Sequence, residues 1–233
     1  MTQQHLLLWR HARTAYNAQA RLQGQIDIPL DEVGHWQART SAARLAARHR
    51  RPARIVASDL TRAAETAGYL GRALGVPVEL DPRLRERAFG EWEGLAGHEI
   101  DARWPGEFRA WRAGGDPVGV GAETRADLAR RLADAVADQV ERTAGLGELV
   151  LVSHGAAIGS VVAELLGQDP AWRGFVGMHN AHWAELVAAG TGVAPAWRML
   201  GYNIGPTDAS SDWNAGPDPE PADDPDGSTR DPD

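Results

Sequence analysis

The sequence predicts an α/β fold: a doubly wound, mainly parallel sheet flanked by helices, with a loop-rich insertion that caps one end. Short apolar runs alternate with helical segments along most of the chain, which is the order that a parallel sheet requires. Two of these runs, Leu6–Trp9 and Leu149–Val152, are followed at once by the polar pairs Arg10–His11 and Ser153–His154. Ligands of open α/β sheets bind outside the carboxyl ends of the strands, so we expect a site there.

The first half of the chain carries turn and cap signals that set the ends of its elements. Ser58 and Asp59 stand where they could cap the helix that follows them, and Gly75 stands where that helix should end. Pro77 favours an edge position for its strand, because proline cannot donate a hydrogen bond to a neighbouring strand. In order, we expect a strand over 5–10, a helix over 35–50, a strand over 54–57, a helix over 61–74 and a strand over 76–80.

The middle of the chain is irregular. Residues 83–122 are rich in glycine, tryptophan and proline and contain only short helical pieces, so we expect a loop-rich insertion that covers a pocket. Thr124 and Asp127 resemble a capping box, although aspartate stands where glutamate or glutamine is preferred. After them we expect a long helix to about Thr143, a strand over 148–152, a helix over 155–166 and late strands over 184–187 and 197–202.

The composition excludes several classes of chemistry. The chain has no cysteine, which rules out disulfides, thiolate metal sites and a cysteine nucleophile. All 24 lysine-or-arginine positions hold arginine, so Schiff-base chemistry on lysine is also excluded. The arginines are scattered along the chain and form no stripe of the kind that binds nucleic acid. We therefore expect no nucleic-acid partner.

The net charge of −8 belongs to the C-terminal tail. Nine acidic residues and one arginine lie in 207–233, so residues 1–206 carry as many arginines as acidic residues. We expect one domain over 1–206 and an acidic, Pro/Asp-rich disordered tail over 207–233, which has little to bury. No apolar run approaches the ~20 residues that span a bilayer, and no signal-peptide pattern is present. We expect no membrane partner and a cytoplasmic protein.

Six motifs follow one another along residues 5 to 205. They are RHARTAYN, RLQG, DIPLDEVG, SDLTRAAET, LRERAFGEWEG and VSHG. Their order and spacing resemble those of the histidine phosphatase superfamily, whose fold is phosphoglycerate-mutase-like. Within that family the chain is most similar to bacterial phosphatases, and the stretch 177–183 resembles one actinobacterial group of them. The resemblance implies an enzyme that transfers phosphoryl groups.

The resemblance points to His11 as the nucleophile. A neutral imidazole can attack phosphorus and form a phosphohistidine, which divides one difficult displacement into two easier ones. Arg10 and Arg62 would hold the phosphoryl oxygens, because a guanidinium stays charged and its planar fork matches phosphate geometry. Without the motifs, His11 could be a packed histidine at a strand end, and Arg62 could pair with Glu65 or Asp59 on the surface.

Two further residues match catalytic positions of the family. His154 matches the second histidine, and we expect it to donate a hydrogen bond to the transferring phosphoryl group. Glu86 matches the proton donor, which protonates the leaving alkoxide and later, as a carboxylate, activates water. Without the motifs, His154 could be a turn histidine held by Ser153. Glu86 could form a surface ion pair with Arg85 or Arg87.

The loop after His11 supplies the expected substrate contacts. These are Asn17, Arg21, Gln23 and Gly24. Each of them could instead be ordinary loop scaffolding. Two positions depart from the family pattern, since Ala12 replaces the usual glycine and Arg13 stands where glutamate or glutamine is common. These departures leave the identity of the substrate open.

The family positions together predict a phosphatase that hydrolyses a small phosphate monoester, a sugar phosphate or a phosphoglycerate, without a metal or another cofactor. The expected catalytic residues are His11, Glu86, His154, Arg10 and Arg62. Three alternatives stay open: a phosphoglycerate mutase, a pseudoenzyme that binds a phosphorylated ligand, and a metallohydrolase built on the two histidines. Against the mutase, the chain lacks the longer insertion and the arginine pair of the mutase branch. Against the pseudoenzyme, it keeps all five expected catalytic residues. Against the metallohydrolase, it has no HExxH motif. The sequence is compatible with a homodimer.

Overall fold

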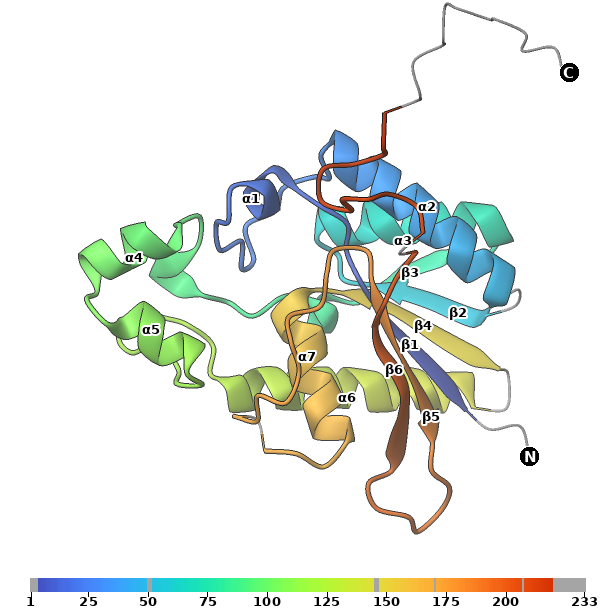
Figure 1. The fold of residues 1–233 in the computed structure, drawn as a ribbon. Helices are drawn as coiled ribbons and strands as arrows, with labels where there is room; N and C mark the ends of the chain where they lie inside the picture. The colour runs from blue at the N-terminus through green and yellow to red at the C-terminus, as the bar shows by residue number, and fades with distance from the viewer. Residues whose placement is uncertain (1–3, 50–51, 145–146, 170, 207, 220–233) are drawn as a thin grey trace, which may run out of the picture.

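The computed structural model describes residues 4–49, 52–144, 147–169, 171–206 and 208–219. Its centre is a six-stranded sheet in the order β3-β2-β4-β1-β5-β6 (Figure 1). The strands are β1 (His5–Arg10), β2 (Pro52–Ala57), β3 (Val78–Leu80), β4 (Glu148–Ser153), β5 (Trp183–Ala188) and β6 (Trp197–Ile204). The pairs among β3, β2, β4 and β1 are parallel, whereas β5 pairs antiparallel with both β1 and β6. The expected α/β sheet is confirmed as a mixed sheet, with β3 at the edge that Pro77 favours.

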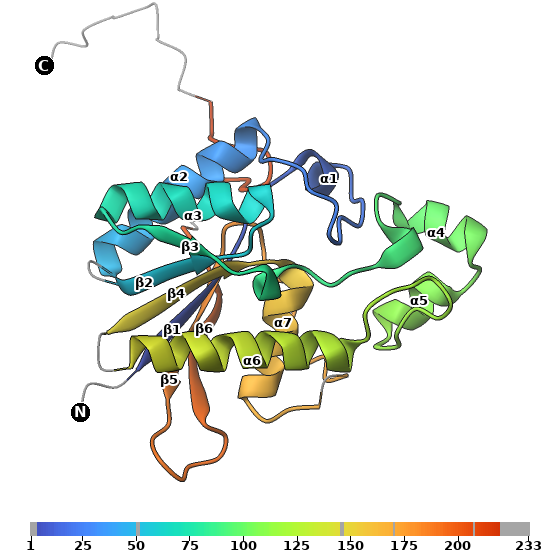
Figure 2. The same cartoon turned by 180° about the vertical axis from the view of Figure 1, so that it is seen from behind.

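Helices cover both faces of this sheet, α2 and α3 on one side and α6 and α7 on the other (Figure 1, Figure 2). The helices are α1 (Ala15–Ala18), α2 (Glu32–Arg48), α3 (Thr61–Leu74), α4 (Gly97–Arg103), α5 (Glu107–Arg112), α6 (Arg125–Thr143) and α7 (Gly155–Leu165), with 3-10 turns η1 (Pro82–Leu84) and η2 (Gly90–Trp92). None of the helices in the described part of the chain is long and apolar enough to cross a membrane.

Alternate residues of the central strands pack on opposite faces of the sheet, as the two-residue period of a strand requires. Leu6 and Leu8 of β1 belong to the core beneath α6 and α7, together with Leu132. Leu7 and Trp9 belong to the core beneath α2 and α3. Because both faces are covered, β1 is a continuous apolar run, which explains why it could be found in the sequence.

The expected elements are present, but α2 starts earlier than expected and α3 is capped by a different residue. α2 begins earlier, at Glu32, because the side chain of Asp31 caps its first turn. The prediction that Ser58 or Asp59 caps α3 is wrong, because the N-cap residue is Leu60 and Asp59 accepts from Arg85 instead. Instead, the backbone N–H of Thr61 donates to Oδ1 of Asp27 at 2.7 Å, from a loop distant in sequence. The end of α3 is as expected, since Gly75 adopts a left-handed conformation with φ +67°.

The loop-rich insertion forms a small lobe with its own apolar core. Phe89, Trp92, Ile100 and Val120 are buried in it, and several more aromatic side chains pack around them. The rings of Trp92 and Trp111 lie 6.2 Å apart and nearly perpendicular, an arrangement that aromatic pairs prefer. In Figure 1 the lobe, with α4 and α5, stands beside the sheet and not on either of its helix layers. It is the cap that the sequence predicts.

The C-terminal segment differs from the expected disordered tail. Residues 207 and 220–233 lie outside the described residues, but residues 208–219 are placed and pack against the domain. The ring of Trp213 lies 4.8 Å from that of Trp36 in α2, and its Nε1 donates to the carbonyl oxygen of Asn180 at 2.8 Å. One tryptophan gives this acidic segment enough apolar surface to dock, which its average composition conceals.

Candidate active site

The register of the sheet places His11 and His154 side by side. Arg10, the last residue of β1, pairs with Ser153, the last residue of β4, in a parallel ladder. The next residue after each is a histidine, and the two ring centroids lie 5.1 Å apart with 57° between the ring planes. Both are buried, with 2% of His11 and 0% of His154 exposed. The two strand-end motifs therefore meet in one place.

His11 is held in one tautomer. Its Nδ1 lies 2.7 Å from the carbonyl oxygen of Ala12. A carbonyl can only accept a hydrogen bond, so Nδ1 carries the proton. Burial, together with the charges of Arg62 and Arg10, lowers the pKa of His11 well below its ordinary value. The ring is therefore neutral at physiological pH, and its Nε2 keeps the lone pair that a nucleophile needs.

Arg10 and Arg62 bring two guanidinium groups to the same place. Nη1 and Nη2 of Arg62 donate to the carbonyl oxygens of Ile26 and Gly24, both at 2.8 Å, and Nη1 of Arg10 donates to that of Met178. Among the described residues, the buried Nε atoms of both arginines have no hydrogen-bond partner. Burial lowers the pKa of Arg62 to about 10, so it stays charged at neutral pH. Two cations with unused donors favour an anion beside them.

His154 has unused hydrogen-bonding capacity as well. Both of its ring nitrogens are buried, and neither has a partner among the described residues. Burial, followed by the charge of Arg62, lowers the pKa of His154 well below its ordinary value. Ser153 does not hold this ring, because its Oγ donates to the carbonyl oxygen of Leu84 at 2.7 Å. A buried, neutral imidazole without a partner can donate one hydrogen bond to a bound ligand.

Glu86 reaches the site from the start of the insertion. Its Oε2 accepts from the backbone N–H of Ala156 at 3.0 Å, and its Oε1 accepts from that of Ala157 at 2.9 Å. These are free N–H groups in the first turn of α7, which begins directly after His154. The helix that follows one catalytic candidate therefore fixes the position of another.

The surface ion pairs that the sequence leaves open for Arg62 and Glu86 do not form within the described part of the chain. The flanking arginines are engaged elsewhere. The pairs that form instead are Arg85–Asp59 and Arg87–Asp116, each at 2.5 Å. Arg62 and Glu86 are thus left facing the site.

Asn17 and Gln23 line the site and also hold its loop together. Oδ1 of Asn17 accepts from the backbone N–H of Thr14 at 3.1 Å and from Nδ2 of Asn180 at 3.2 Å. Oε1 of Gln23 accepts from the hydroxyl of Thr14 at 3.0 Å. The side-chain oxygens of both residues are therefore committed to the protein, and their N–H groups are what they can offer a substrate.

Arg21 and Gly24 complete the loop. Nη1 of Arg21 donates to Oε2 of Glu99 at 2.6 Å, which ties the loop to α4. Gly24 has φ +54°, and a Cβ atom there would lie 2.1 Å from Oε1 of Glu93, so any other residue would be strained and would displace the Glu93 side chain. Its carbonyl oxygen is one of the two that hold Arg62. Gly24 thus positions an arginine and does not contact a ligand through a side chain.

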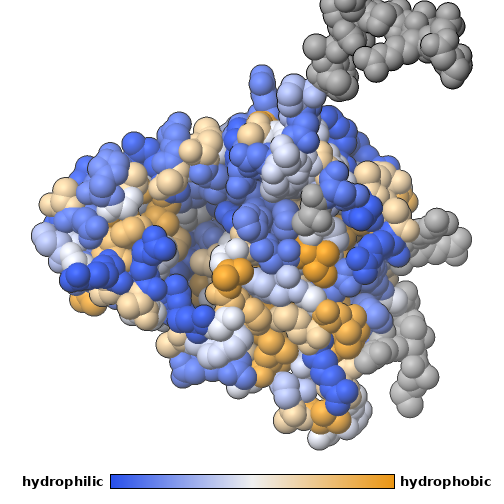
Figure 3. Space-filling view, in the orientation of Figure 1, coloured by the Kyte–Doolittle hydropathy of each residue, from blue (hydrophilic) through white to orange (hydrophobic). Residues whose placement is uncertain are grey.

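A cavity of ≈280 Å³ lies among these residues. Every expected site residue except His154, which lies against His11, lines it. The lining is Arg10, His11, Asn17, Arg21, Leu22, Gln23, Gly24, Arg62, Glu86, Phe89, Trp111, Gly155, Ala156, Gly177 and Met178. Figure 3 shows this face of the molecule hollowed between the cap lobe and the rest. The fold therefore brings together all of the residues that the sequence singles out.

A second cavity of ≈270 Å³ adjoins the first and shares four lining residues with it: Trp111, Gly155, Ala156 and Gly177. Three arginines line it, Arg87, Arg125 and Arg173. Arg87 is only 1% exposed, and its Nη1 has no partner among the described residues. Burial, with the charges of Arg87 and Arg173, lowers the pKa of Arg125 to about 10. This cavity therefore holds an excess of positive charge.

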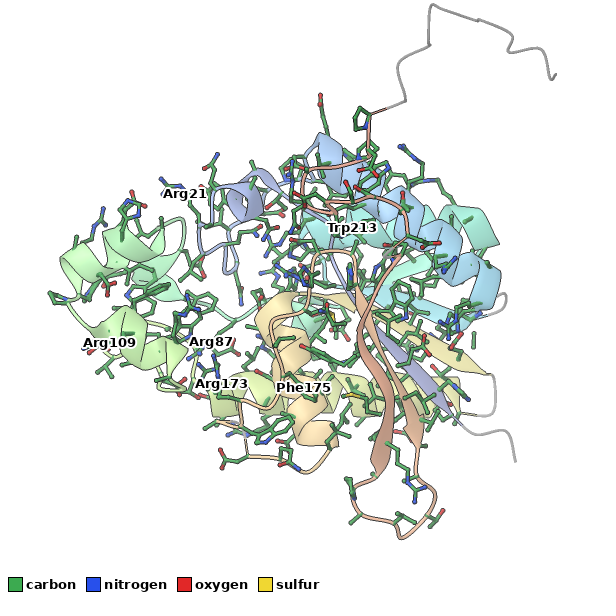
Figure 4. All side chains as sticks on the ribbon, in the orientation of Figure 1. Arg21, Arg87, Arg109, Arg173, Phe175 and Trp213 are labelled. Carbon is green, nitrogen blue, oxygen red and sulfur yellow. The ribbon has the colours of Figure 1, made fainter. Side chains whose placement is uncertain are left out.

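No sequence pattern singles out Arg125 or Arg173. They belong to separate segments, and only the packing of the insertion against α7 brings them to Arg87. Figure 4 shows Arg87 and Arg173 close together between α5 and α7.

Within the described residues, no three histidine, aspartate or glutamate side chains lie close enough to hold a metal ion. The charged groups that can stabilise an anion here are guanidinium groups.

Comparison with known proteins assigns this arrangement to a class. A profile of the histidine phosphatase superfamily (branch 1) matches residues 6–202. The chain belongs to this superfamily, and it is a phosphatase.

Among its relatives are mycobacterial phosphatases of one kind. The glucosyl-3-phosphoglycerate phosphatase of Mycolicibacterium vanbaalenii is 40% identical over 193 residues, which cover 80% of this chain and 85% of the relative. A solved structure of a mycobacterial glucosyl-3-phosphoglycerate phosphatase complexed with VO3 matches with a TM-score of 0.77 and 40% identity, over 85% of this chain and 98% of that one. The actinobacterial resemblance is thereby confirmed. A probable phosphoglycerate mutase of Yersinia enterocolitica is 38% identical over 173 residues, 71% of this chain and 76% of the relative.

Proposed function

We propose that the protein hydrolyses a phosphate monoester through a phosphohistidine on His11, with Arg10, Arg62, His154 and Glu86 as the other catalytic residues. The observation that supports this most is the pair of buried imidazoles, 5.1 Å apart, beside two buried guanidinium groups with unused N–H donors. A phosphoryl group supplies the acceptors that these donors lack. The pseudoenzyme alternative is less favoured, because His11 also has a free lone pair.

In the first step, Nε2 of His11 attacks phosphorus, and the N–P bond forms as the ester P–O bond breaks. Glu86 in its acid form gives its proton to the leaving alkoxide oxygen. Arg10 and Arg62 bind the phosphoryl oxygens, and His154 donates one hydrogen bond where negative charge grows. The products are the free alcohol and phosphohistidine.

In the second step, the carboxylate of Glu86 takes a proton from a water molecule that attacks phosphorus. The N–P bond breaks, inorganic phosphate forms, and Nε2 of His11 regains its lone pair. The carbonyl oxygen of Ala12 holds Nδ1–H throughout, so the same nitrogen acts in both steps. Guanidinium groups offset the phosphate charge, and we expect turnover to be unchanged by EDTA.

As the substrate we propose glucosyl-3-phosphoglycerate, or a phosphate ester that likewise carries a second negative charge. The relatives that are 40% identical bear the name of this substrate. Its carboxylate would suit the cavity of Arg87, Arg125 and Arg173, which adjoins the phosphate site. A cytoplasmic location belongs to the same proposal, because charged phosphate esters do not cross membranes unaided.

A phosphoglycerate mutase is the second candidate, favoured by the 38% identity to a probable mutase. A mutase returns the phosphoryl group to substrate instead of to water. The test is to incubate the protein with glucosyl-3-phosphoglycerate and with 3-phosphoglycerate, with and without 2,3-bisphosphoglycerate, and to measure phosphate release and isomerisation. We expect release of phosphate and no fast isomerisation. Isomerisation much faster than hydrolysis would overturn the proposal.

A further inference from the structure

A third cavity, of ≈620 Å³, opens beside the phosphate site on the side of the C-terminal segment. It shares four lining residues with the phosphate cavity: Arg10, Asn17, Gly177 and Met178. Its opposite side is formed by Asp212, Asn214 and Ala215. These residues lie beyond residue 202, where the match to the superfamily ends. A segment outside the shared domain thus borders the active site.

Trp213 anchors this segment. Its ring lies 4.8 Å from the ring of Trp36 and 5.6 Å from that of His182. Its Nε1 donates to the carbonyl oxygen of Asn180, and its own carbonyl oxygen accepts from Nε2 of Gln37, both at 2.8 Å. Figure 4 shows Trp213 beside α2. Two ring contacts and two hydrogen bonds hold residues 212–215 in place.

The anchored segment is connected to the loop that carries the nucleophile. Nδ2 of Asn180 donates to the carbonyl oxygen of His11 at 3.1 Å and to Oδ1 of Asn17 at 3.2 Å. From the same loop, Nη1 of Arg13 donates to the carbonyl oxygen of Asn214. The two sides of the third cavity are therefore parts of one hydrogen-bonded network.

The chemistry of the third cavity differs from that of the arginine cavity. Asn17, Asn180 and Asn214 contribute amide groups, and Asp212 contributes a carboxylate. The guanidinium of Arg13 is already paired with Asp31 at 2.9 Å. Amides and a carboxylate offer both donors and acceptors, which suits hydroxyl groups. A neutral sugar in the arginine cavity would instead leave the excess of positive charge there without an anion.

We propose that residues 212–215, anchored by Trp213, form the outer wall of a leaving-group subsite for the uncharged, hydroxyl-rich part of the phosphate ester. This inference rests on the proposed function, because it takes the phosphate to bind at His11. The C-terminal segment then contributes to substrate specificity, and the small phosphate cavity works without it on small esters.

Two full-length variants test the subsite. Asn214→Trp places an indole at the rim of the cavity, from a side chain that is exposed. Pro217→Trp places the same group on the same segment, at an exposed position that does not line the cavity. With glucosyl-3-phosphoglycerate, we expect Asn214→Trp to raise KM about 10-fold. The reason is that the indole would take space from the hydroxyl-rich part of the substrate, which would lose a modest set of contacts with the cavity. Neither variant should alter hydrolysis of p-nitrophenyl phosphate, whose leaving group carries no hydroxyl-rich part.

Inhibition by the dephosphorylated product, glucosylglycerate, gives a readout that needs no turnover of the sugar ester. It should inhibit wild-type hydrolysis of p-nitrophenyl phosphate competitively and act about 10-fold more weakly on Asn214→Trp. Equal KM values in the two variants, or no inhibition of the wild type, would overturn the subsite. Loss of both substrates in Asn214→Trp alone would also overturn it, since the segment would then act on the phosphate cavity. A wild type that hydrolyses no monoester would instead contradict the proposed function.

Discussion

The imidazole rings of His11 and His154 lie 5.1 Å apart at the ends of two paired parallel strands, and both are closed off from solvent. Burial and the charge of Arg62 lower the pKa of both rings well below the ordinary value. Both are therefore neutral in the folded protein at a pH where free histidine is largely protonated. This pair should lower the stability of the domain in acid, in the same direction as His182, whose pKa burial also lowers.

The expected effect of pH on stability follows from these two pKa values. In the unfolded chain both histidines titrate near the ordinary value of about 6.5, so below it the unfolded state binds more protons than the folded state. The free energy of unfolding should therefore be lower at about pH 5.5 than at about pH 7.5. Urea unfolding at both pH values measures this, and His154→Gln should remove part of the difference.

A control is needed because His49 titrates with the opposite sign. Burial alone would lower its pKa, but its hydrogen bond to Glu148, at 2.7 Å, and the charges of Glu148 and Glu185 raise it. Its contribution to stability is fully present below about pH 6.5 and is lost as the pH rises through the raised pKa. His49→Gln should therefore steepen the loss of stability in acid. If His154→Gln left the pH dependence unchanged, the buried neutral state of this ring would be contradicted.

The second prediction concerns Gly24→Ala. The new Cβ would lie 2.1 Å from Oε1 of Glu93, which accepts from the backbone N–H groups of Gln25 at 3.0 Å and Phe89 at 2.9 Å. Displacing this carboxylate releases the loop whose carbonyl oxygen, on Gly24, holds Arg62. Misplacing a catalytic group by about 1 Å can cost about 10²-fold in rate, and we expect kcat/KM to fall by about that factor. Gly75→Ala is the matched control, because Gly75 has a similar φ of +67° with open space around it. Equal effects of the two variants would mean that backbone strain alone is responsible.

The candidate catalytic residues could be selected from the sequence because the family motifs that point to them are short and local. His11 and His154 each follow an apolar strand, and neighbouring parallel strands end at the same edge of a sheet. The contacts that fix Glu86 could not be predicted from the sequence, since they depend on the first turn of α7 lying beside a residue far away in the chain. The cap that Asp27 gives to α3 could not be predicted either, because Asp27 is also distant in the chain from the helix that it caps. Local patterns show which residues carry chemistry, but not which distant residues hold them.

The third prediction concerns the C-terminal segment. Its average composition predicts disorder, but the side chain of Trp213 packs residues 212–215 against the domain. Trp213→Ala removes the contact with Trp36 and the hydrogen bond to Asn180. Truncating a fully buried aromatic costs about 3–5 kcal/mol, and Trp213 is half-buried, so we expect a loss of about 1–3 kcal/mol in the free energy of unfolding. Thermal unfolding measures this. An unchanged melting temperature would mean that the segment does not dock.

The fourth prediction separates proton donation from simple support of the pocket. Glu86→Gln keeps the shape of the side chain but cannot give up a proton, so hydrolysis of alkyl phosphates should slow by about 10²–10⁴-fold. The phosphorylation step with p-nitrophenyl phosphate should slow much less, because p-nitrophenolate leaves without protonation. Dephosphorylation then becomes limiting, and more phosphoenzyme should accumulate. Single-turnover kinetics with both substrates gives the comparison.

The contrary outcome for Glu86 is equally specific. Equal losses on both substrates, with no retained phosphoenzyme, would mean that Glu86 only supports the first turn of α7 through its two backbone contacts. The proton for the leaving group would then have to come from a donor other than Glu86.

Passage of the phosphoryl group through His11 is tested most directly by labelling the enzyme during turnover. The wild type is mixed with a radiolabelled phosphate ester and quenched rapidly in alkali, and the labelled peptide is identified. We predict a label that is stable in alkali, is lost in acid and lies on His11, whose Nε2 keeps the free lone pair. His11→Ala should carry no label and should hydrolyse the ester at the background rate. A label on another residue, or turnover that survives in His11→Ala, would contradict the phosphohistidine mechanism.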